Sequence, residues 1–533
     1  MKIIHSGTQL SGLIRCGAVA ALALMLGACA GMGRDTPRAP RRVIIGGLDI
    51  NAVNDVLVRG FGEIKDRAFE DPPIDDLFTA ALAGLKSIDP EIRAISTGGR
   101  LIVTYRGRTI GDLGRASRSD IPAWSLATLQ ALVASRKASP LMLAADAEAI
   151  YMAVFAGALT ALDPYSRYAT RENAVRNRLV RDGVIGLGVR VVLEDDGALI
   201  QAIVDGGPAA LAELELDDVI THANGVSLTG RSLADIRRRL DGAIGTTVTL
   251  TAKRPGEPEP RVVTAELDLV VPDTVTSSLS DGLLEVRIAS FNQRTAYAVE
   301  KAVTTAQHDN GGTLKGIVLD LRGDPGGLLD QAIDVADLFL ESGTIITLHG
   351  RHPGANQYYA ANRGDVAEGV PMAAVIDGRS ASATEIVVAA LQDNKRAAIV
   401  GTVSWGKGSV QSLRRLPNGG EIALTWARMV TPRGVDVHGL GLLPDVCLSG
   451  APASVSDVVD QLFAEAATGD AAHRRWLSPA DDPAVHESLR MDCPAETHAD
   501  RIVDLEVARR IVSDPVLMGL VTFDDAPQLA VIP

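Results

Sequence analysis

The chain has 533 residues, of which 46% are hydrophobic and 22% are charged, and this composition excludes wholesale disorder. At about 150 residues per domain, the length predicts about three or four folded units. The formal net charge is −14 and no extended tract of Lys and Arg occurs, which argues against a nucleic-acid-binding protein with its basic stripe.

The N-terminal residues have the features of a secretory signal. An uncharged apolar run covers 16–28, which is shorter than the roughly 20 residues needed to span a bilayer. It ends in LGAC at Cys29, which is similar to a bacterial lipobox, where the cysteine is acylated and becomes the new N-terminus. We predict a lipoprotein signal peptide over 1–28, acylation of Cys29 and a flexible tether over 29–42. The alternative is an ordinary signal peptide in which Cys29 has no role.

This reading predicts a bacterial periplasmic protein that is anchored to the membrane by its acyl chains, since two or three chains give stable anchoring. Ala30 follows the cysteine, and the common bacterial sorting rule then favours the inner leaflet of the outer membrane. Of the four cysteines, Cys16 lies in the predicted signal peptide and Cys29 is the predicted acylation site. In an oxidising periplasm the other two, Cys447 and Cys493, are predicted to form a disulfide. Two separate buried thiols are the alternative.

The region 43–180 is predicted to form a mostly helical N-terminal domain, because apolar residues recur there at intervals of three and four. A short strand interrupts it at 101–105. The expected helices cover 55–69, 73–85 and 146–162.

From 181 to 269 the pattern changes to short β-strands, and from 270 to 449 strands and helices alternate. The region 450–533 returns to a helical pattern without a recognisable motif. We therefore predict a multidomain α/β (α+β) fold with a layered α/β core after a β-rich domain. Strands are expected at 187–193, 198–203, 218–223, 247–253, 284–288, 317–321, 372–376, 397–400 and 421–425, and helices at 232–240, 328–339 and 383–392.

One serine stands at a site suited to nucleophilic catalysis. The strand at 372–376 is followed by a tight turn, and Ser382 then opens an apolar helix. A serine at a helix start is usually only a cap, but the same position aims backbone N–H groups at whatever the hydroxyl attacks. Lys407, between two glycines, is a candidate base. Glu385 in the first helical turn is expected to interact with the helix dipole.

Three other patterns are weaker. The segment 401–408 imitates a phosphate-binding loop, but Gly408 stands where Ser or Thr must hold magnesium. The segment 378–382 lacks the closing glycine of a G-x-S-x-G turn. His349 and His352 have no further ligand nearby in the sequence. We predict no metal and no cofactor.

Taken together, the segments resemble the carboxyl-terminal processing peptidases, a family of tail-specific proteases. The resemblance covers about residues 161–446 and depends on the order of its motifs. These are LDPYSRY at 162–168, a PDZ-like module, GIVLDLRGDPGGLL at 316–329, RSASATEI at 379–386, WGKGSVQ at 405–411 and GLGLLPD at 439–445.

The resemblance implies roles for single residues. Ser382 matches the nucleophile, Lys407 the general base and Gln411 the residue that orients the lysine amine. The oxyanion hole would use the N–H of Ala383 and one from Gly326-Gly327. Departures from the family pattern are Asp324 where Asn is common, Thr384 where Ser is common and Trp405 where Phe is common.

The proposed base fits the chemistry. A lysine has an ordinary pKa of about 10.4, and burial among apolar groups lowers it, which makes the neutral amine available.

The resemblance also implies that 181–269 is a PDZ-like domain and that 270–449 is the protease core. The segment Gly186-Leu187-Gly188-Val189 opens a strand, and its N–H groups would hold a peptide's terminal carboxylate while the peptide adds as a strand. Without the resemblance this would be a generic glycine-containing turn.

The predicted function is a periplasmic serine endopeptidase with a Ser-Lys dyad, which cleaves proteins or peptides presented by free C-termini. A non-catalytic PDZ scaffold or adaptor lipoprotein is the alternative, and a Ser-Lys amidase acting on cell-wall peptides is another, although the core lacks its Ser-x-x-Lys motif. The sequence leaves open the substrate, an adaptor lipoprotein, a homo-oligomer, and whether the PDZ domain activates or inhibits.

Overall fold

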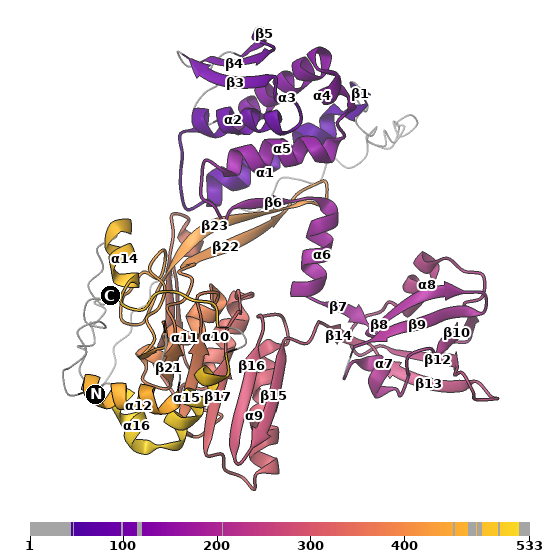
Figure 1. The fold of residues 1–533 in the computed structure, drawn as a ribbon. Helices are drawn as coiled ribbons and strands as arrows, with labels where there is room; N and C mark the ends of the chain where they lie inside the picture. Colours follow the sequence, from indigo (N-terminus) through magenta and orange to yellow (C-terminus); the bar gives the residue numbers. More distant parts are fainter. Residues whose placement is uncertain are drawn as a thin grey trace, which may run out of the picture.

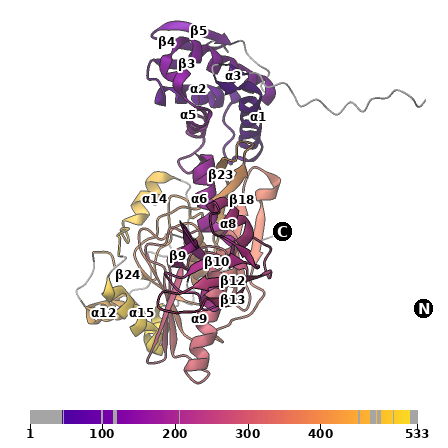
Figure 2. The same cartoon turned by 90° about the vertical axis from the view of Figure 1, so that its right-hand side faces the viewer.

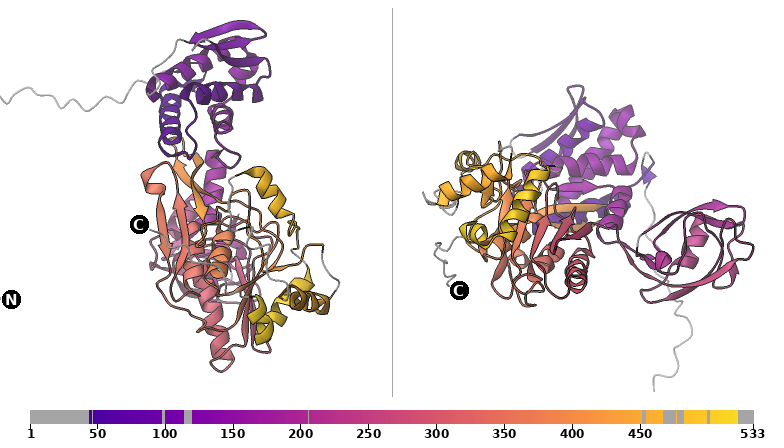
Figure 3. Two further views of the ribbon diagram at one scale, coloured as in Figure 1. Left: turned by 90° about the vertical axis from the view of Figure 1, so that its left-hand side faces the viewer. Right: turned by 60° about the horizontal axis from the view of Figure 1, so that its bottom comes forward.

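The computed structural model describes residues 44–45, 47–97, 100–113, 120–204, 206–450, 454–466, 476, 482–498 and 501–521. The predicted signal peptide, Cys29 and the tether lie outside these residues. Over the described ranges, no helix combines the length and the hydropathy needed to cross a membrane. The chain forms an N-terminal helical module above an α/β core, and a β-rich module that projects to one side (Figure 1; Figure 3, right).

The helical module is built on aspartate-capped helices. Asp49, Asp120 and Asp146 accept hydrogen bonds from N–H groups in the first turns of α1, α3 and α5. The rings of Phe61 and Phe78 lie 4.1 Å apart in its core. The sequence predicted only the middle strand of its three-stranded sheet β3-β4-β5 and missed α3. Its elements are β1 (Ile44–Ile45), β2 (Leu48–Asp49), α1 (Ile50–Arg67), α2 (Ile74–Ala83), β3 (Ile92–Thr97), β4 (Arg100–Tyr105), β5 (Arg108–Leu113), α3 (Ile121–Ala138), α4 (Pro140–Ala144) and α5 (Ala147–Leu159).

The β-rich module is an antiparallel sheet of order β13-β12-β10-β9-β8 with two helices. Its entry strand β7 pairs with its exit strand β14, so the chain enters and leaves at one place. The predicted strand 187–193 is wrong in its start, because Gly188 has φ +75° and separates β7 from β8. The elements are β7 (Val184–Gly186), β8 (Val189–Glu194), β9 (Gly197–Ile203), α7 (Pro208–Leu211), β10 (Val219–Ala223), β11 (Val226–Ser227), α8 (Leu233–Leu240), β12 (Thr247–Lys253), β13 (Arg261–Glu266) and β14 (Asp268–Val270).

The core has two sheets with helices between them. Its larger sheet has the order β15-β16-β17-β20-β21-β24, and the steps from β16 to β24 are parallel. Apolar side chains of α9, α10 and α11 share one core with this sheet and with the second sheet, β19-β18-β23-β22. The elements are β15 (Val275–Ser280), β16 (Leu283–Ile288), α9 (Thr295–Asp309), β17 (Gly316–Asp320), α10 (Leu329–Asp337), β18 (Thr344–His349), β19 (Gln357–Ala360), β20 (Met372–Ile376), α11 (Ala383–Asp393), β21 (Ala398–Gly401), β22 (Ser409–Arg415), β23 (Glu421–Val430) and β24 (Val446–Cys447).

A connecting segment leads from the helical module, past the core, to the β-rich module. Strand β6 (Arg167–Ala169) pairs with β23, and α6 (Arg171–Arg181) then runs toward the β-rich module (Figure 2).

The C-terminal region covers the outer face of the larger sheet, where α12 and α15 contribute apolar residues to a second core. The predicted pair Cys447 and Cys493 is joined by a disulfide with a Cα–Cα distance of 5.9 Å. This bond ties the segment after α14 to the last core strand. The helices described here are α12 (Val455–Ala466), α14 (Pro483–Arg490), α15 (Ile502–Ser513) and α16 (Pro515–Val521).

Candidate active site

Ser382 lies at the start of α11, directly after the turn that follows β20. Its φ is +60°, a backbone conformation that non-glycine residues rarely adopt, and strained residues of this kind cluster at functional sites. The neighbouring Ser380 is fully buried, and its hydroxyl donates to the carbonyl of Leu321 at 2.9 Å. Ser380 therefore holds the turn, while Ser382 is only half-buried and presents its hydroxyl.

Lys407 precedes β22 and is half-buried. Its Nζ lies 5.7 Å from the ring centroid of Tyr165, and within the described part of the chain it makes no hydrogen bond or ion pair. Burial lowers the pKa of Lys407, the positive charge of Arg167 lowers it further, and the negative charge of Glu385 opposes both. The environment therefore favours the neutral amine that a general base requires.

Glu385 joins the serine loop to the lysine loop. Its Oε2 accepts the N–H of Ser382 at 2.7 Å and the N–H of Lys407 at 3.0 Å. Its Oε1 accepts the N–H of Gly406 at 2.7 Å and the hydroxyl of Ser404 at 2.5 Å. Burial raises the pKa of this carboxyl, and the four donors oppose that shift.

The expectation that Glu385 serves the helix dipole missed this role. The sequence does hold one signal, since a glutamate three positions after a helix-capping serine is the capping-box pattern, in which its carboxylate reaches back to the serine N–H. The bonds to Ser404, Gly406 and Lys407 have no such local signal.

The predicted oxyanion hole is only partly available. The N–H of Gly326 donates to Asp324 Oδ1 at 2.8 Å, so in this structure it is engaged within the turn. The N–H of Gly327 makes no hydrogen bond among the described residues, and this glycine is exposed at the turn. The N–H of Ala383, at the first position of α11, has no partner within the helix. Ala383 and Gly327 are therefore the candidate pair.

Gln411 lies on β22, two residues past Ser409. Its amide donates to Ser409 Oγ at 3.1 Å and to Thr425 Oγ1 at 3.3 Å. In the described part of the chain no hydrogen bond joins it to the lysine amine, so its orienting role stays a prediction.

The segment 162–168 positions the side chains beside the lysine. Asp163 Oδ1 accepts the N–H groups of Tyr165 and Ser166 and the hydroxyl of Thr425, at 2.8 to 2.9 Å. This folds the segment against β23 and places the Tyr165 ring near the Lys407 ammonium. No role was predicted for Tyr165 or Arg167, because their position depends on the pairing of β6 with β23.

The four predicted peptide-binding residues, 186–189, line a cavity of about 510 Å³ in the β-rich module. Strand β8 is the outer strand of its sheet, and Ile236 and Leu240 of α8 line the opposite wall. Arg190 and Arg237 also line the groove. An extended peptide fits here as an added strand with an apolar side chain directed between β8 and α8.

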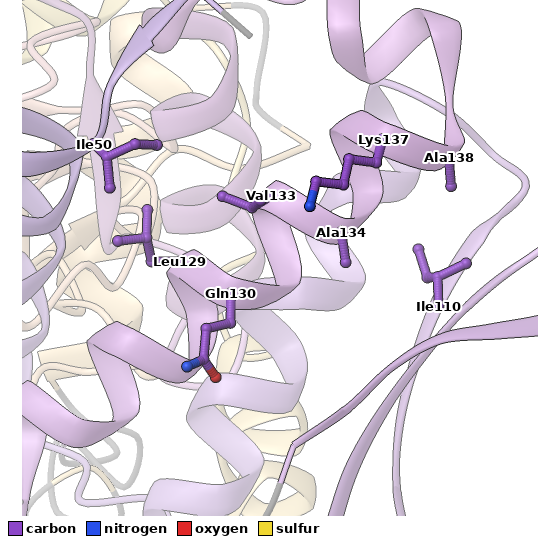
Figure 4. A pocket seen from close by; sticks show the side chains of 8 residues that line it. All are labelled: Ile50, Ile110, Leu129, Gln130, Val133, Ala134, Lys137 and Ala138. Carbon is purple, nitrogen blue, oxygen red and sulfur yellow. The ribbon is translucent and has the colours of Figure 1, made fainter. Parts of the chain in front are cut away.

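A second cavity, of about 590 Å³, lies in the helical module between α3, Ile50 of α1 and Ile110 of β5 (Figure 4). It is lined mainly by apolar side chains, with Lys137 as the charged residue among those that line it. It contains no serine, cysteine or carboxylate, so it adds no group to the catalytic site.

Over the described ranges, no group of three or more His, Cys, Asp or Glu side chains is arranged to hold a metal ion.

Two family models match the chain. The model for peptidase family S41 matches residues 282–448, which include Ser382, Lys407 and Gln411, and the model for a PDZ domain matches residues 199–254.

Similar proteins share these regions. A carboxy-terminal-processing protease of Bartonella bacilliformis is 37% identical over 292 residues, which are 54% of this chain and 67% of that protease. The solved photosystem II D1 C-terminal processing protease is 26% identical, covers 62% of this chain and 92% of its own, and has a TM-score of 0.35. The PDZ domain of the carboxy-terminal protease from Vibrio cholerae, solved with a peptide, is 31% identical over 16% of this chain and 96% of its own, with a TM-score of 0.16.

Proposed function

The chain belongs to peptidase family S41 and is a serine-type endopeptidase, and from this membership we propose that Ser382 and Lys407 form its catalytic dyad. The observation that carries the proposal is the shared carboxylate of Glu385, which accepts the backbone N–H of both residues. This carboxylate holds the serine loop and the lysine loop together at the start of α11.

In the proposed acylation, the neutral amine of Lys407 takes the proton of the Ser382 hydroxyl as Oγ attacks the scissile carbonyl carbon. The carbonyl electrons move to its oxygen, which receives hydrogen bonds from the N–H groups of Ala383 and Gly327. The tetrahedral intermediate then collapses, and the Lys407 ammonium gives its proton to the leaving amine.

In deacylation a water molecule attacks the acyl-enzyme, and Lys407 again accepts a proton. Collapse of the second intermediate returns the proton to Ser382 Oγ and releases the new carboxylate end. Because only the neutral amine can act as the base, the rate rises as the pH passes through the lowered pKa of Lys407.

The PDZ module is proposed to present substrates by their free C-termini. Its groove is lined mainly by apolar side chains, and β8, the outer strand of the described sheet, can add a peptide strand. We expect chains with a free apolar C-terminal residue to be cut faster than the same chains with an amidated or charged end. Bulky substitution of Gly188, whose φ is +75°, should remove this preference while leaving cleavage of short peptides. An unchanged preference would contradict the proposed presentation.

The proposed location is the bacterial periplasm, with the protein anchored in the membrane by acylated Cys29. It rests on the sequence LGAC at 26–29. Cys29→Ser should release a soluble or unprocessed protein. Native protein without acyl chains, identified by mass spectrometry in the soluble periplasmic fraction, would contradict the anchor.

The dyad is tested by cleavage of an unfolded protein substrate. Ser382→Ala and Lys407→Ala should each abolish cleavage and leave the melting temperature unchanged, and a chelator should have no effect. Lys301→Ala, on the exposed face of α9, is the matched lysine control and should cleave at the normal rate. Full activity of Lys407→Ala would contradict the dyad.

A further inference from the structure

Asp324 is a buried acid in the turn between β17 and α10. Its side chain is 0% exposed. One oxygen, Oδ1, accepts the N–H of Gly326 at 2.8 Å. The other, Oδ2, has no hydrogen-bond partner among the described residues. A buried oxygen without a partner is costly as part of an anion and much less costly in a neutral carboxyl.

This acid is bonded to both sides of the oxyanion hole. Its side chain holds Gly326, and its carbonyl accepts the N–H of Ala381 at 3.0 Å and the hydroxyl of Thr384 at 3.2 Å. A Cβ on Gly326 would lie 2.5 Å from the Ala381 oxygen and 2.8 Å from the Ala383 nitrogen. The turn that Asp324 fixes is therefore in direct contact with the backbone around the nucleophile.

The charged groups on the surrounding elements are engaged elsewhere. Arg287 of β16 bonds to Asp320 at 2.7 Å, and Arg322 bonds to the same carboxylate at 2.8 Å. Asp377, after β20, accepts the N–H of Gly323, and Glu385 of α11 accepts its four donors. Among the described residues, none of these groups forms an ion pair with Asp324.

The pKa of the Asp324 carboxyl is raised toward the neutral range. Burial raises the pKa of its carboxyl to about 7, although the Gly326 N–H and the charge of Arg287 oppose the shift. An asparagine at this position would not titrate.

We propose that Asp324 is a proton-linked positioning residue, which supports the oxyanion hole when neutral and opposes the developing oxyanion when ionised. This inference rests on the proposed Ser382–Lys407 mechanism. Through it, the protease acquires an upper pH limit that the base Lys407 alone would not impose.

The expected size follows from Coulomb's law. Asp324 Oδ1 accepts the N–H of Gly326, and the next residue, Gly327, would donate to the oxyanion, so we take a separation of about 7 Å between the two charges. At that distance and an effective dielectric constant of about 20, a full negative charge lowers the rate about 50-fold.

The test compares kcat and KM between pH 5 and 10 for wild type, Asp324→Asn and Asp393→Asn. Asp393 is the matched control, because it is an acid with a largely covered side chain at the far end of α11, and burial also raises its pKa. In the wild type and the control, kcat should fall about 50-fold above neutral pH with little change in KM. In Asp324→Asn, kcat should keep rising to a plateau.

Two further measurements test the role of Asp324. Arg287→Gln removes a cation that holds the pKa of Asp324 down. The alkaline limb of the kcat profile of this variant should therefore move to higher pH. Infrared difference spectra of the Ser382→Ala protein should show a neutral carboxyl that titrates near pH 7 and is lost when Asp324→Asn is added. These spectra need no activity.

The two possible failures are separable. An inactive wild-type enzyme would contradict the proposed function. An active enzyme whose Asp324→Asn profile coincides with the wild-type profile, or spectra without the titrating carboxyl, would contradict the role of Asp324 alone.

Discussion

Replacing Glu385 by glutamine tests whether the buried carboxylate couples the two catalytic loops. Four donors converge on this carboxylate. A glutamine amide can accept through only one atom. Ser404 can reverse its hydroxyl to accept from the new NH₂ group, so the best orientation directs that group toward Ser404 and leaves the N–H of Gly406 without an acceptor.

The expected loss of activity follows from the one N–H group that loses its acceptor. One buried N–H without an acceptor costs about 1–3 kcal/mol. If that cost falls on the transition state, Glu385→Gln lowers kcat by about 5- to 160-fold. The substitution also removes the negative charge that holds the pKa of Lys407 up, so the acid limb of the rate profile should move to lower pH.

The assay is the pH dependence of kcat on a short peptide, which bypasses the PDZ groove. Glu421→Gln is the matched control, because Glu421 is a buried glutamate of β23 that is paired with Arg178 and Arg181 and lies outside the proposed dyad. Its profile should match the wild type. A Glu385→Gln enzyme with an unchanged plateau and an unshifted acid limb would refute the coupling.

Three further substitutions have defined outcomes. Asp324→Asn should raise the free energy of unfolding at pH 9 by about 4 kcal/mol and change it little below pH 4. The reason is that the raised pKa of Asp324 makes the stability of the wild type fall as the pH climbs toward 7. Thermal melts at both pH values measure this. Cys493→Ser opens a loop with a sequence separation of 46 and should cost about 4 kcal/mol in urea unfolding, an effect that reduction of the wild type should reproduce. Gly326→Ala places a Cβ 2.5 Å from the Ala381 oxygen and should lower kcat about 100-fold or more, whereas Gly364→Ala, at a similar φ with open space around it, should not.

The sequence predicted much of the fold where the hydrophobic period was clear. The strand at 247–253 and the strand at 372–376 are found with the predicted bounds. Helix α3 was missed because its buried face includes small and polar residues, such as Ser125, Thr128 and Ser135, which conceal the apolar spacing. Strands β3 and β5 were missed because their polar residues become ordered only by pairing with β4.

The site was predictable to the extent that its residues lie in ordered motifs. The roles of Ser382 and Lys407 were predicted in this way, and in the structure their backbone N–H groups donate to one carboxylate. Two features were not predictable: the Gly326 N–H is hydrogen-bonded, and one oxygen of Asp324 has no partner among the described residues. Both depend on how the turn after β17 packs against α11. Such properties arise from tertiary contacts between segments about 60 residues apart, which motif spacing does not encode.

The most direct test of the central claim is covalent labelling of the intact enzyme with a serine-reactive fluorophosphonate, followed by peptide mapping. One label per chain should be found on Ser382, and in the Asp324→Asn protein, which lacks the buried acid, the labelling rate should rise with pH as Lys407 loses its proton. Lys407→Ala should label at least about 100-fold more slowly, since general-base catalysis contributes about 10²–10⁴. A label on Ser380 or another serine, or labelling of Lys407→Ala at the wild-type rate, would contradict the Ser382–Lys407 dyad.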